Sequence, residues 1–298
     1  MAKKTLLVLL AAVIIFVVAV AVMSTSYPKQ LSGEKIAVIR IQGTISSQEA
    51  FVPTSQAKPK TIIGLLEKAE EDPSVKAVVI EINSPGGSAV ASDEIASKVK
   101  EMNKTTVAWI GDLGASGAYW VASSSDAVVA HPLSLTCSVG AYTLVSDWSG
   151  LFEEYGINYT IVKSGELKDI GSMYREMTPE EERIFQDMVD TVFEEFISEV
   201  KENRELTDAQ TQIISDGRPC LGKDAVSYGL ADYTGSEEDA IALAQQMADL
   251  KKKKVVIIEE EKGGLSELFG DTFSEAFYSL GVGLGEGLKS SSEPALNV

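Results

Sequence analysis

Residues 77–88 read AVVIEINSPGGS, an apolar run rich in Val and Ile that ends in a glycine turn just before a helix-like stretch. Short apolar runs of the same kind occupy residues 35–41, 106–110, 127–130 and 159–162, and helix-like stretches separate them. This alternation is typical of βαβ units, in which a helix carries the chain back between parallel strands. The sequence therefore predicts an α/β fold with a largely parallel sheet.

Helices are expected at residues 61–71 and 88–103, from near Ser116, and at 143–155. Towards the C-terminus, a helix is expected at residues 236–250, a strand at 255–258 and an amphipathic segment at 265–280.

A long helix is predicted after Thr178, where Thr178-Pro179-Glu180-Glu181 combines an N-cap, a proline at the first helical position and a capping-box glutamate. Apolar residues from Ile184 to Val200 recur at helical spacing, and acidic residues occupy the opposite face. We expect the apolar face to pack on the core. A subunit interface is the alternative.

Composition excludes several classes of function. The chain has 298 residues, 45% of them apolar, and 26 Lys plus Arg against 44 Asp plus Glu give a net charge of −18, so nucleic acid is a poor partner. One histidine, His131, and two cysteines, Cys137 and Cys220, cannot assemble the usual zinc sites, and no metal or cofactor is expected. Any histidine-based catalytic pair would need His131, which favours a base of another kind.

The amino-terminal segment predicts a membrane anchor. Residues 5–23 carry no charge and would form a helix about 28 Å long, close to the roughly 30 Å of a bilayer core. Lys3 and Lys4 precede this span, so the positive-inside rule places the amino terminus in the cytoplasm and the remaining chain outside the cell membrane. A cleaved signal peptide is the alternative, because Ala19-Val20-Ala21 fits a cleavage site.

The two cysteines leave two possibilities open in such an oxidising space. A disulfide between Cys137 and Cys220 is possible, and a pair of buried free thiols explains them equally well.

Two glycine-rich turns are candidate catalytic elements. Ser84-Pro85-Gly86-Gly87-Ser88 could present backbone N–H groups to an oxyanion at a helix amino terminus, although a plain strand-to-helix turn uses the same residues. Gly114-Ala115-Ser116-Gly117-Ala118-Tyr119 leaves the Ser116 hydroxyl accessible where the positive end of a helix stabilises an alkoxide. A capping serine or tight helix packing is the simpler explanation.

A third candidate is the segment from Ser164 to Ser172, which contains Lys168 among glycine and apolar neighbours. A lysine that loses solvation on folding has a lowered pKa, and its neutral amine can act as a base. Most lysines in loops are simply exposed, so the case depends on all three segments together.

These three segments, with Ser138-Val139-Gly140 and Tyr174-Arg175-Glu176-Met177-Thr178, resemble the signal peptide peptidase A family over residues from about Lys35 to Gln246. Proteins of that family are membrane-anchored serine proteases with a Clp protease and crotonase type of fold. The resemblance implies a Ser-Lys dyad, with Ser116 as nucleophile and Lys168 as general base.

Further roles follow from the same resemblance. Ser138 is expected to hydrogen-bond the lysine, and backbone N–H groups of Gly86 or Gly87 and of Gly117 are expected to form the oxyanion hole. One residue departs from the family pattern, because Cys137 stands where glycine is more common.

The family also implies a division of the chain and a set of partners. Residues 1–30 would form the anchor and linker, 31–262 the catalytic domain, and 263–298 a C-terminal amphipathic segment and tail. Catalytic domains would assemble into a ring-like homo-oligomer at the membrane and hydrolyse remnant signal peptides and other short hydrophobic or unfolded segments. The alternatives are a stomatin-cleaving membrane protease, a crotonase-type acyl-CoA enzyme and a non-catalytic scaffold.

Overall fold

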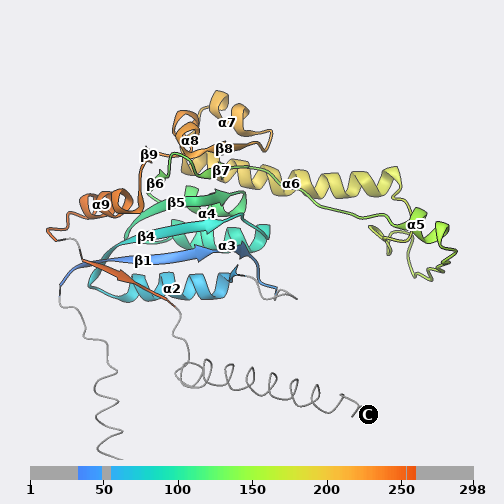
Figure 1. Ribbon diagram of the computed structural model, residues 1–298, viewed down its shortest axis with the longest axis horizontal. Coiled ribbons are helices and arrows are strands. Elements are labelled where there is room, and N and C mark those ends of the chain that lie inside the picture. Colours follow the sequence, from blue (N-terminus) through green and yellow to red (C-terminus); the bar gives the residue numbers. More distant parts are fainter. Residues whose placement is uncertain (1–32, 49–54, 253, 260–298) are drawn as a thin grey trace, which may run out of the picture.

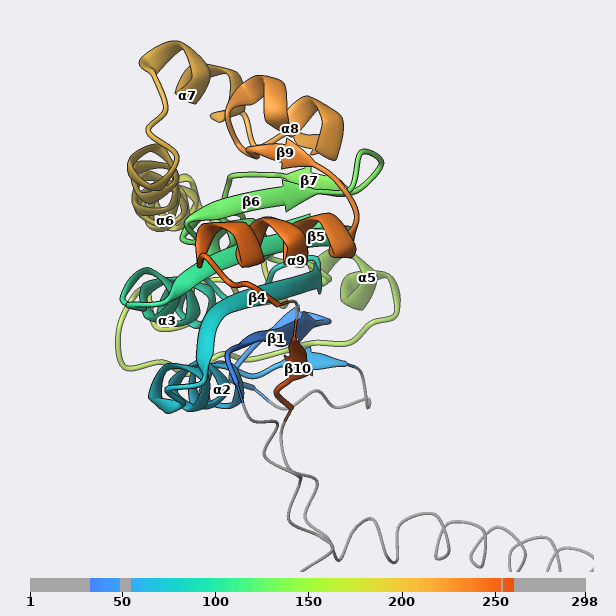
Figure 2. The same cartoon turned by 90° about the vertical axis from the view of Figure 1, so that its left-hand side faces the viewer.

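The computed structural model describes residues 33–48, 55–252 and 254–259, and these form a body with a long projecting arm (Figure 1). A parallel sheet runs through the body in the strand order β10-β1-β4-β5-β6-β9, which can be followed upwards in Figure 2. Its strands are β1 Lys35–Gln42, β4 Val75–Ser84, β5 Thr105–Ala115, β6 Ala127–Ala130, β9 Tyr233–Thr234 and β10 Val255–Ile257. The predicted α/β fold with a parallel sheet is confirmed.

Helices cover both faces of the sheet because its strands are apolar on both sides. Ala37 and Ile39 face the core under α2 (Pro59–Glu71), α3 (Ala89–Lys100) and α4 (Gly117–Ser123). Ile36 and Val38 point the other way, into a second cluster under α9 (Glu237–Met247). Successive side chains of a strand alternate between its faces, so a continuous apolar run satisfies both layers.

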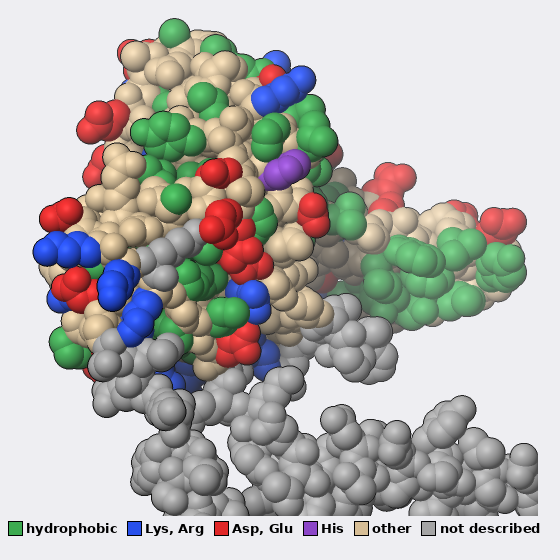
Figure 3. Space-filling view, turned by 60° about the vertical axis from the view of Figure 1, so that its left-hand side comes forward, with side chains coloured by type: hydrophobic (Ala, Val, Ile, Leu, Met, Phe, Trp, Pro, Cys, Tyr) green, Lys and Arg blue, Asp and Glu red, His purple; other side chains and the backbone are tan. Residues whose placement is uncertain are grey.

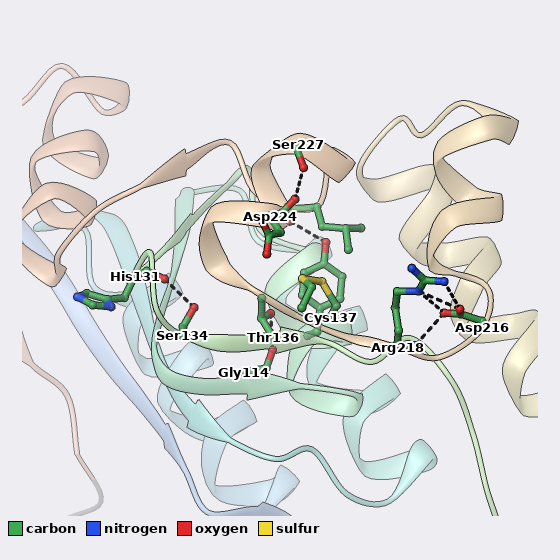
Figure 4. The surroundings of a disulfide bond; sticks show 12 residues. Gly114, His131, Ser134, Thr136, Cys137, Asp216, Arg218, Asp224 and Ser227 are labelled. Carbon is green, nitrogen blue, oxygen red and sulfur yellow. Dashed lines mark hydrogen bonds and ion pairs between the residues drawn. A yellow bond between two sulfur atoms is a disulfide. The ribbon is translucent and has the colours of Figure 1, made fainter.

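Smaller elements extend the sheet where β5 ends. Strand β7 (Leu135–Cys137) pairs in parallel with the last residues of β5, and β8 (Pro219–Leu221) pairs antiparallel with β7. Helices α7 (Asp208–Ile214) and α8 (Gly222–Tyr228) flank β8. Strands β2 (Thr44–Ile45) and β3 (Gln56–Ala57) form a separate, short parallel sheet. Cys137 and Cys220 form a disulfide between β7 and β8, which decides the question that the sequence left open (Figure 4).

The arm consists of α5 (Ser149–Glu154), the loop after it and the first part of α6 (Pro179–Asn203) (Figure 1). The predicted capping box is present, since the Thr178 side chain accepts from the Glu181 N–H and the Glu181 carboxylate accepts from the Thr178 N–H. Phe196 and Val200 near the other end of α6 are buried, and Phe196 stacks on Trp120 with ring centroids 4.5 Å apart. The helix therefore packs on the core at its C-terminal end only.

Two sequence predictions for the arm are wrong. Residues 159–162 form no strand in the structure, and the helix expected at 143–155 is reduced to α5. Tyr and Ile favour strands because they fit a half-buried pleated surface. Among the described residues, no strand pairs with the arm to provide such a surface.

No helix in the described part of the chain is long and apolar enough to cross a membrane. The anchor predicted at residues 5–23 and the segment predicted at 265–280 lie outside the described residues.

Replacing Phe196 with alanine tests how the arm is attached. Phe196→Ala removes the buried ring that stacks on Trp120, so we expect the free energy of unfolding to fall by about 3–5 kcal/mol. Urea denaturation followed by circular dichroism measures the change. Glu195→Ala, on the exposed back of the same helix, is the control and should change it by no more than about 0.5 kcal/mol. Equal effects of the two substitutions would contradict this attachment.

Candidate active site

Ser116 occupies a sharp turn between a strand and a helix. Strand β5 ends at Ala115 and α4 begins at Gly117, and Ser116 between them has φ 55° and ψ −130°. Positive φ is rare for a residue with a Cβ, and such backbone strain is concentrated at functional sites. This strand-turn-helix geometry is that of a nucleophile elbow.

Backbone hydrogen bonds hold the turn from both sides. The Ser116 N–H donates to the Cys137 carbonyl over 3.0 Å, and the Ser116 carbonyl accepts from the N–H groups of Tyr119 and Trp120. The Ser116 side chain makes no capping hydrogen bond to α4, so the capping explanation for this serine is wrong. Its hydroxyl is half-buried and lines a cavity of about 390 Å³.

The glycine turn after β4 packs directly against this elbow. Gly86 has φ 88°, and a Cβ there would lie 2.6 Å from the Gly117 nitrogen and 2.8 Å from the Ala115 carbonyl oxygen. The Gly86 N–H is already used, because it donates to Ser84 Oγ over 3.1 Å. Of the two glycines that the sequence could not separate, Gly87 is therefore the better candidate donor.

Gly87 and Gly117 come close together beside Ser116. The Gly87 nitrogen would lie 3.5 Å from a Cβ placed on Gly117, and within the described part of the chain neither N–H group donates to another protein atom. Two free N–H groups next to a hydroxyl are the arrangement that stabilises a tetrahedral oxyanion.

Ser138 also lies at this edge of the sheet. Cys137 pairs with Ala115 in the register of β7 and β5, so the residues that follow them, Ser138 and Ser116, are neighbours. Ser138 has φ 55°, and its N–H donates to the Arg218 carbonyl over 3.0 Å. The structure thus places Ser138 beside Ser116. The expected hydrogen bond of Ser138 to the lysine stays a prediction.

The cavity beside Ser116 is largely apolar. Trp120 of α4 forms part of its wall. One face of α6 forms another part, with the residues Phe185, Met188, Val189, Val192 and Phe196. The sequence pattern identified this helical face as apolar and assigned it to the core or an interface, without connecting it to the active site. Nothing in its spacing distinguishes a cavity wall from a packed core face.

A family model for peptidase family S49 matches residues 98–251. The chain belongs to peptidase family S49. It is 36% identical over 262 residues to a Methanocaldococcus jannaschii protein that is provisionally named a protease, covering 86% of this chain and 82% of the relative. It is 31% identical over 215 residues to an Enterococcus faecium protein provisionally named signal peptide peptidase SppA, covering 70% of this chain and 62% of that protein.

A solved structure supports the fold. A membrane-bound stomatin-specific protease has a TM-score of 0.50 and 13% sequence identity, and the match covers 78% of this chain and all of that one. The S49 chain is thus a serine peptidase, which argues against the acyl-CoA enzyme and the scaffold as alternatives.

Lys168 is not brought to Ser116 within one S49 chain. It lies in the loop between α5 and α6, on the arm, with an exposed side chain, and it does not line the cavity that contains Ser116 (Figure 1). The expected loss of solvation at Lys168 is therefore absent in the isolated chain. His131 is exposed as well, on the body surface in Figure 3, and its Nδ1 accepts from the Leu133 N–H.

A network of charges fixes the loop that carries Lys168. Arg175 donates to both carboxylate oxygens of Asp169 and of Glu181, and Lys163 binds Asp169 over 2.7 Å. Arg175 and then Lys163 hold the pKa of Asp169 well below its usual range, and Arg175 with the Thr178 N–H lowers that of Glu181 to about 2. Since Glu181 is almost fully buried and lies in the first turn of α6, the network joins the Lys168 loop to that helix.

The pH dependence of stability tests this network. Both carboxylates have pKa values below those of an unfolded chain, so their contribution is present at neutral pH and is lost as the pH falls from about 4.5 towards 2. Arg175→Gln should therefore be less stable than the wild type at pH 7, and the difference should shrink over that range. Thermal unfolding at a series of pH values measures it.

Arg218→Gln is the matched control, because the Arg218–Asp216 pair is about half exposed on both sides. Exposed pairs contribute little, so this variant should stay near the wild type at every pH. A pH-independent loss of stability in Arg175→Gln would show that the carboxylates are not the cause.

Gly86→Ala tests the close approach of the two turns. A methyl group there meets backbone atoms that cannot move aside, and φ 88° is unfavourable for alanine, so we expect labelling of Ser116 by a fluorophosphonate to be abolished. Gly64→Ala in α2 is the control, since its Cβ would meet open space. That variant should label normally and gain about 0.5–1 kcal/mol of stability. Normal labelling of Gly86→Ala would contradict the packing described.

Proposed function

We propose that this S49 serine peptidase is a membrane-anchored endopeptidase of the signal peptide peptidase type, which hydrolyses remnant signal peptides and other short hydrophobic or unfolded segments. The observation that carries the proposal is the elbow of Ser116, which opens on an apolar cavity beside the N–H groups of Gly87 and Gly117, and neither group donates to another atom of the described residues. An apolar cavity suits an apolar side chain of a peptide substrate. The name of the Enterococcus faecium relative agrees with this class of activity.

The proposed mechanism uses Ser116 and Lys168. The neutral amine of Lys168 takes the hydroxyl proton while Ser116 Oγ attacks the peptide carbonyl carbon. The N–H groups of Gly87 and Gly117 stabilise the oxyanion, typically by a few kcal/mol for each donor. As the C–N bond breaks, Lys168 gives the proton to the leaving amine. A water molecule, deprotonated by the same lysine, then hydrolyses the acyl-enzyme and releases Ser116.

This mechanism requires Lys168 to come from a neighbouring subunit. Of the described residues that line the cavity, none is a lysine, a histidine or a carboxylate, so the cavity has no strong base of its own. Lys168 is carried on an arm that points away from the body of its own chain (Figure 1). An arm of one subunit that reaches the cavity of the next would supply the base and remove it from water.

The surface of the arm supports such an assembly. Apolar side chains gather on the projecting part of the molecule (Figure 3), and those with large exposed fractions are Tyr142, Leu144, Trp148, Leu151, Tyr155, Ile157, Tyr159, Ile161, Val162, Leu167, Met173, Tyr174 and Met188. A contiguous apolar surface of this kind is typical of a protein interface. We propose that it is covered by further copies of the chain in a ring-like homo-oligomer with bodies of the Clp protease and crotonase type.

The proposed location is the outer side of the cell membrane. The described residues all fall within the predicted catalytic domain, and the predicted anchor precedes them in the sequence. The Cys137–Cys220 disulfide supports an oxidising compartment, because disulfides rarely persist in the cytosol.

Complementation between two inactive variants tests the shared site. Ser116→Ala and Lys168→Ala should each abolish peptide hydrolysis, whereas co-expression of the two should restore a fraction of the wild-type rate, since some neighbours then combine an intact serine with an intact lysine. The measurement uses a fluorogenic peptide with an apolar recognition segment. Lys201→Ala, an exposed lysine on α6, is the control and should keep full activity.

Retained hydrolysis by Lys168→Ala alone would contradict the dyad. Two inactive variants that show no complementation, although both assemble, would contradict its division between subunits. Preferential cleavage of a stomatin peptide over signal peptides would favour the other membrane protease type, whose fold this chain shares.

A further inference from the structure

We propose that the Cys137–Cys220 disulfide is a positioning element of the active site, which holds Cys137 in the conformation that the Ser116 turn needs. This inference rests on the proposed peptidase function. It assigns the disulfide a role in catalysis in addition to any general stabilisation of the fold.

The first observation is the backbone of the residues that follow β7. Cys137 has φ 65° and Ser138 has φ 55°, so two consecutive residues with a Cβ lie in the left-handed region. That region is unfavourable for every L-amino acid with a Cβ, and cysteine is not among the residues that relieve it with a local hydrogen bond. Something else must hold Cys137 there.

The second observation is what this conformation does for Ser116. The Cys137 carbonyl accepts the Ser116 N–H over 3.0 Å, and Thr136 Oγ1 donates to the Gly114 carbonyl over 2.7 Å. The end of β7 therefore contacts the nucleophile turn on both sides of Ala115. A change of φ at Cys137 rotates its carbonyl away from the Ser116 N–H, and the elbow then loses one of the bonds that fix it.

The third observation is that β8 supplies the restraint. Cys220 lies in β8, which pairs antiparallel with β7, and the Ser138 N–H donates to the Arg218 carbonyl just before that strand. Figure 4 shows the disulfide where the chain passes from Arg218 towards α8. Cys137 and Cys220 are both buried, with exposed fractions of 1% and 8%. The covalent link thus joins the strained residue, through buried sulfur atoms, to the neighbouring strand beside the site.

The alternative explanation is that the disulfide only stabilises the fold as a cross-link. The two cysteines are 83 residues apart in sequence, and the loop they close contains the arm, α6 and α7. Closing a long loop stabilises a protein through its unfolded state, whatever the conformation at the link. Glycine at position 137 separates the two explanations, because it adopts φ 65° without strain but cannot close the loop.

The experiment compares two disulfide-free proteins with the wild type. Cys137→Ala/Cys220→Ala should lose at least tenfold in kcat with little change in KM. Cys137→Gly/Cys220→Ala should recover most of that kcat and be insensitive to reductant. Its midpoint in urea denaturation should stay below that of the wild type, because it also lacks the cross-link. Wild-type protein treated with a reductant that opens the bond should resemble the alanine pair.

Size-exclusion chromatography checks that each variant keeps the assembly of the wild type. If both pairs keep the wild-type kcat, or if the glycine pair is folded and assembled but as slow as the alanine pair, the positioning role is wrong. Wild-type protein that neither hydrolyses peptides nor labels at Ser116 would contradict the proposed function, and the inference with it. If the wild type is active and keeps its kcat after loss of the disulfide, the inference is wrong and the proposed function stands.

Discussion

The active site depends on one backbone constraint, the positive φ of Ser116 at the junction of β5 and α4. This turn lifts a hydroxyl out of a buried strand and places it at the start of a helix. Because the conformation is unfavourable for serine, the surrounding structure must hold it. Gly86 does so from one side by lying within contact distance of Ala115 and Gly117, and Cys137 does so from the other through its carbonyl. The site is thus formed mainly by three backbone segments and less by side chains.

Parallel topology explains why those three segments meet. The strands β4, β5 and β7 are parallel neighbours, so their carboxyl ends reach the same edge of the sheet. The turns at residues 84–88 and 114–117 were predictable from sequence, because an apolar run followed by glycines is a local signal. The strands themselves were predictable for the same reason. Strand β7 has only three residues and no such pattern, so sequence patterns did not place Ser138 beside Ser116, and family resemblance alone marked it as a site residue.

The arm shows where sequence reasoning fails. Its apolar residues predict a strand at 159–162 and, on α6, a face that packs on the core or, as the alternative, forms a subunit interface, since such patterns usually report burial within the same chain. In the structure, Val162 is 92% exposed and Met188 is 58% exposed. The pattern correctly indicates a surface that avoids water, but hydrophobic periodicity does not say which molecule covers it. The disulfide was undecidable for a related reason, because it depends on a pairing of short strands whose cysteines are 83 residues apart.

The division between body and arm has a consequence for the proposed mechanism. The body holds the hydroxyl and the N–H groups that stabilise an oxyanion, whereas the arm holds the lysine in a loop fixed by Arg175. The dyad needs an environment that excludes water, because loss of solvation favours the neutral form of an amine, which can accept a proton. Burial of the arm against a second chain would provide that environment and the geometry in the same step. An isolated chain would then lack peptidase activity even though its own elbow is complete, and assembly would control when the serine becomes reactive.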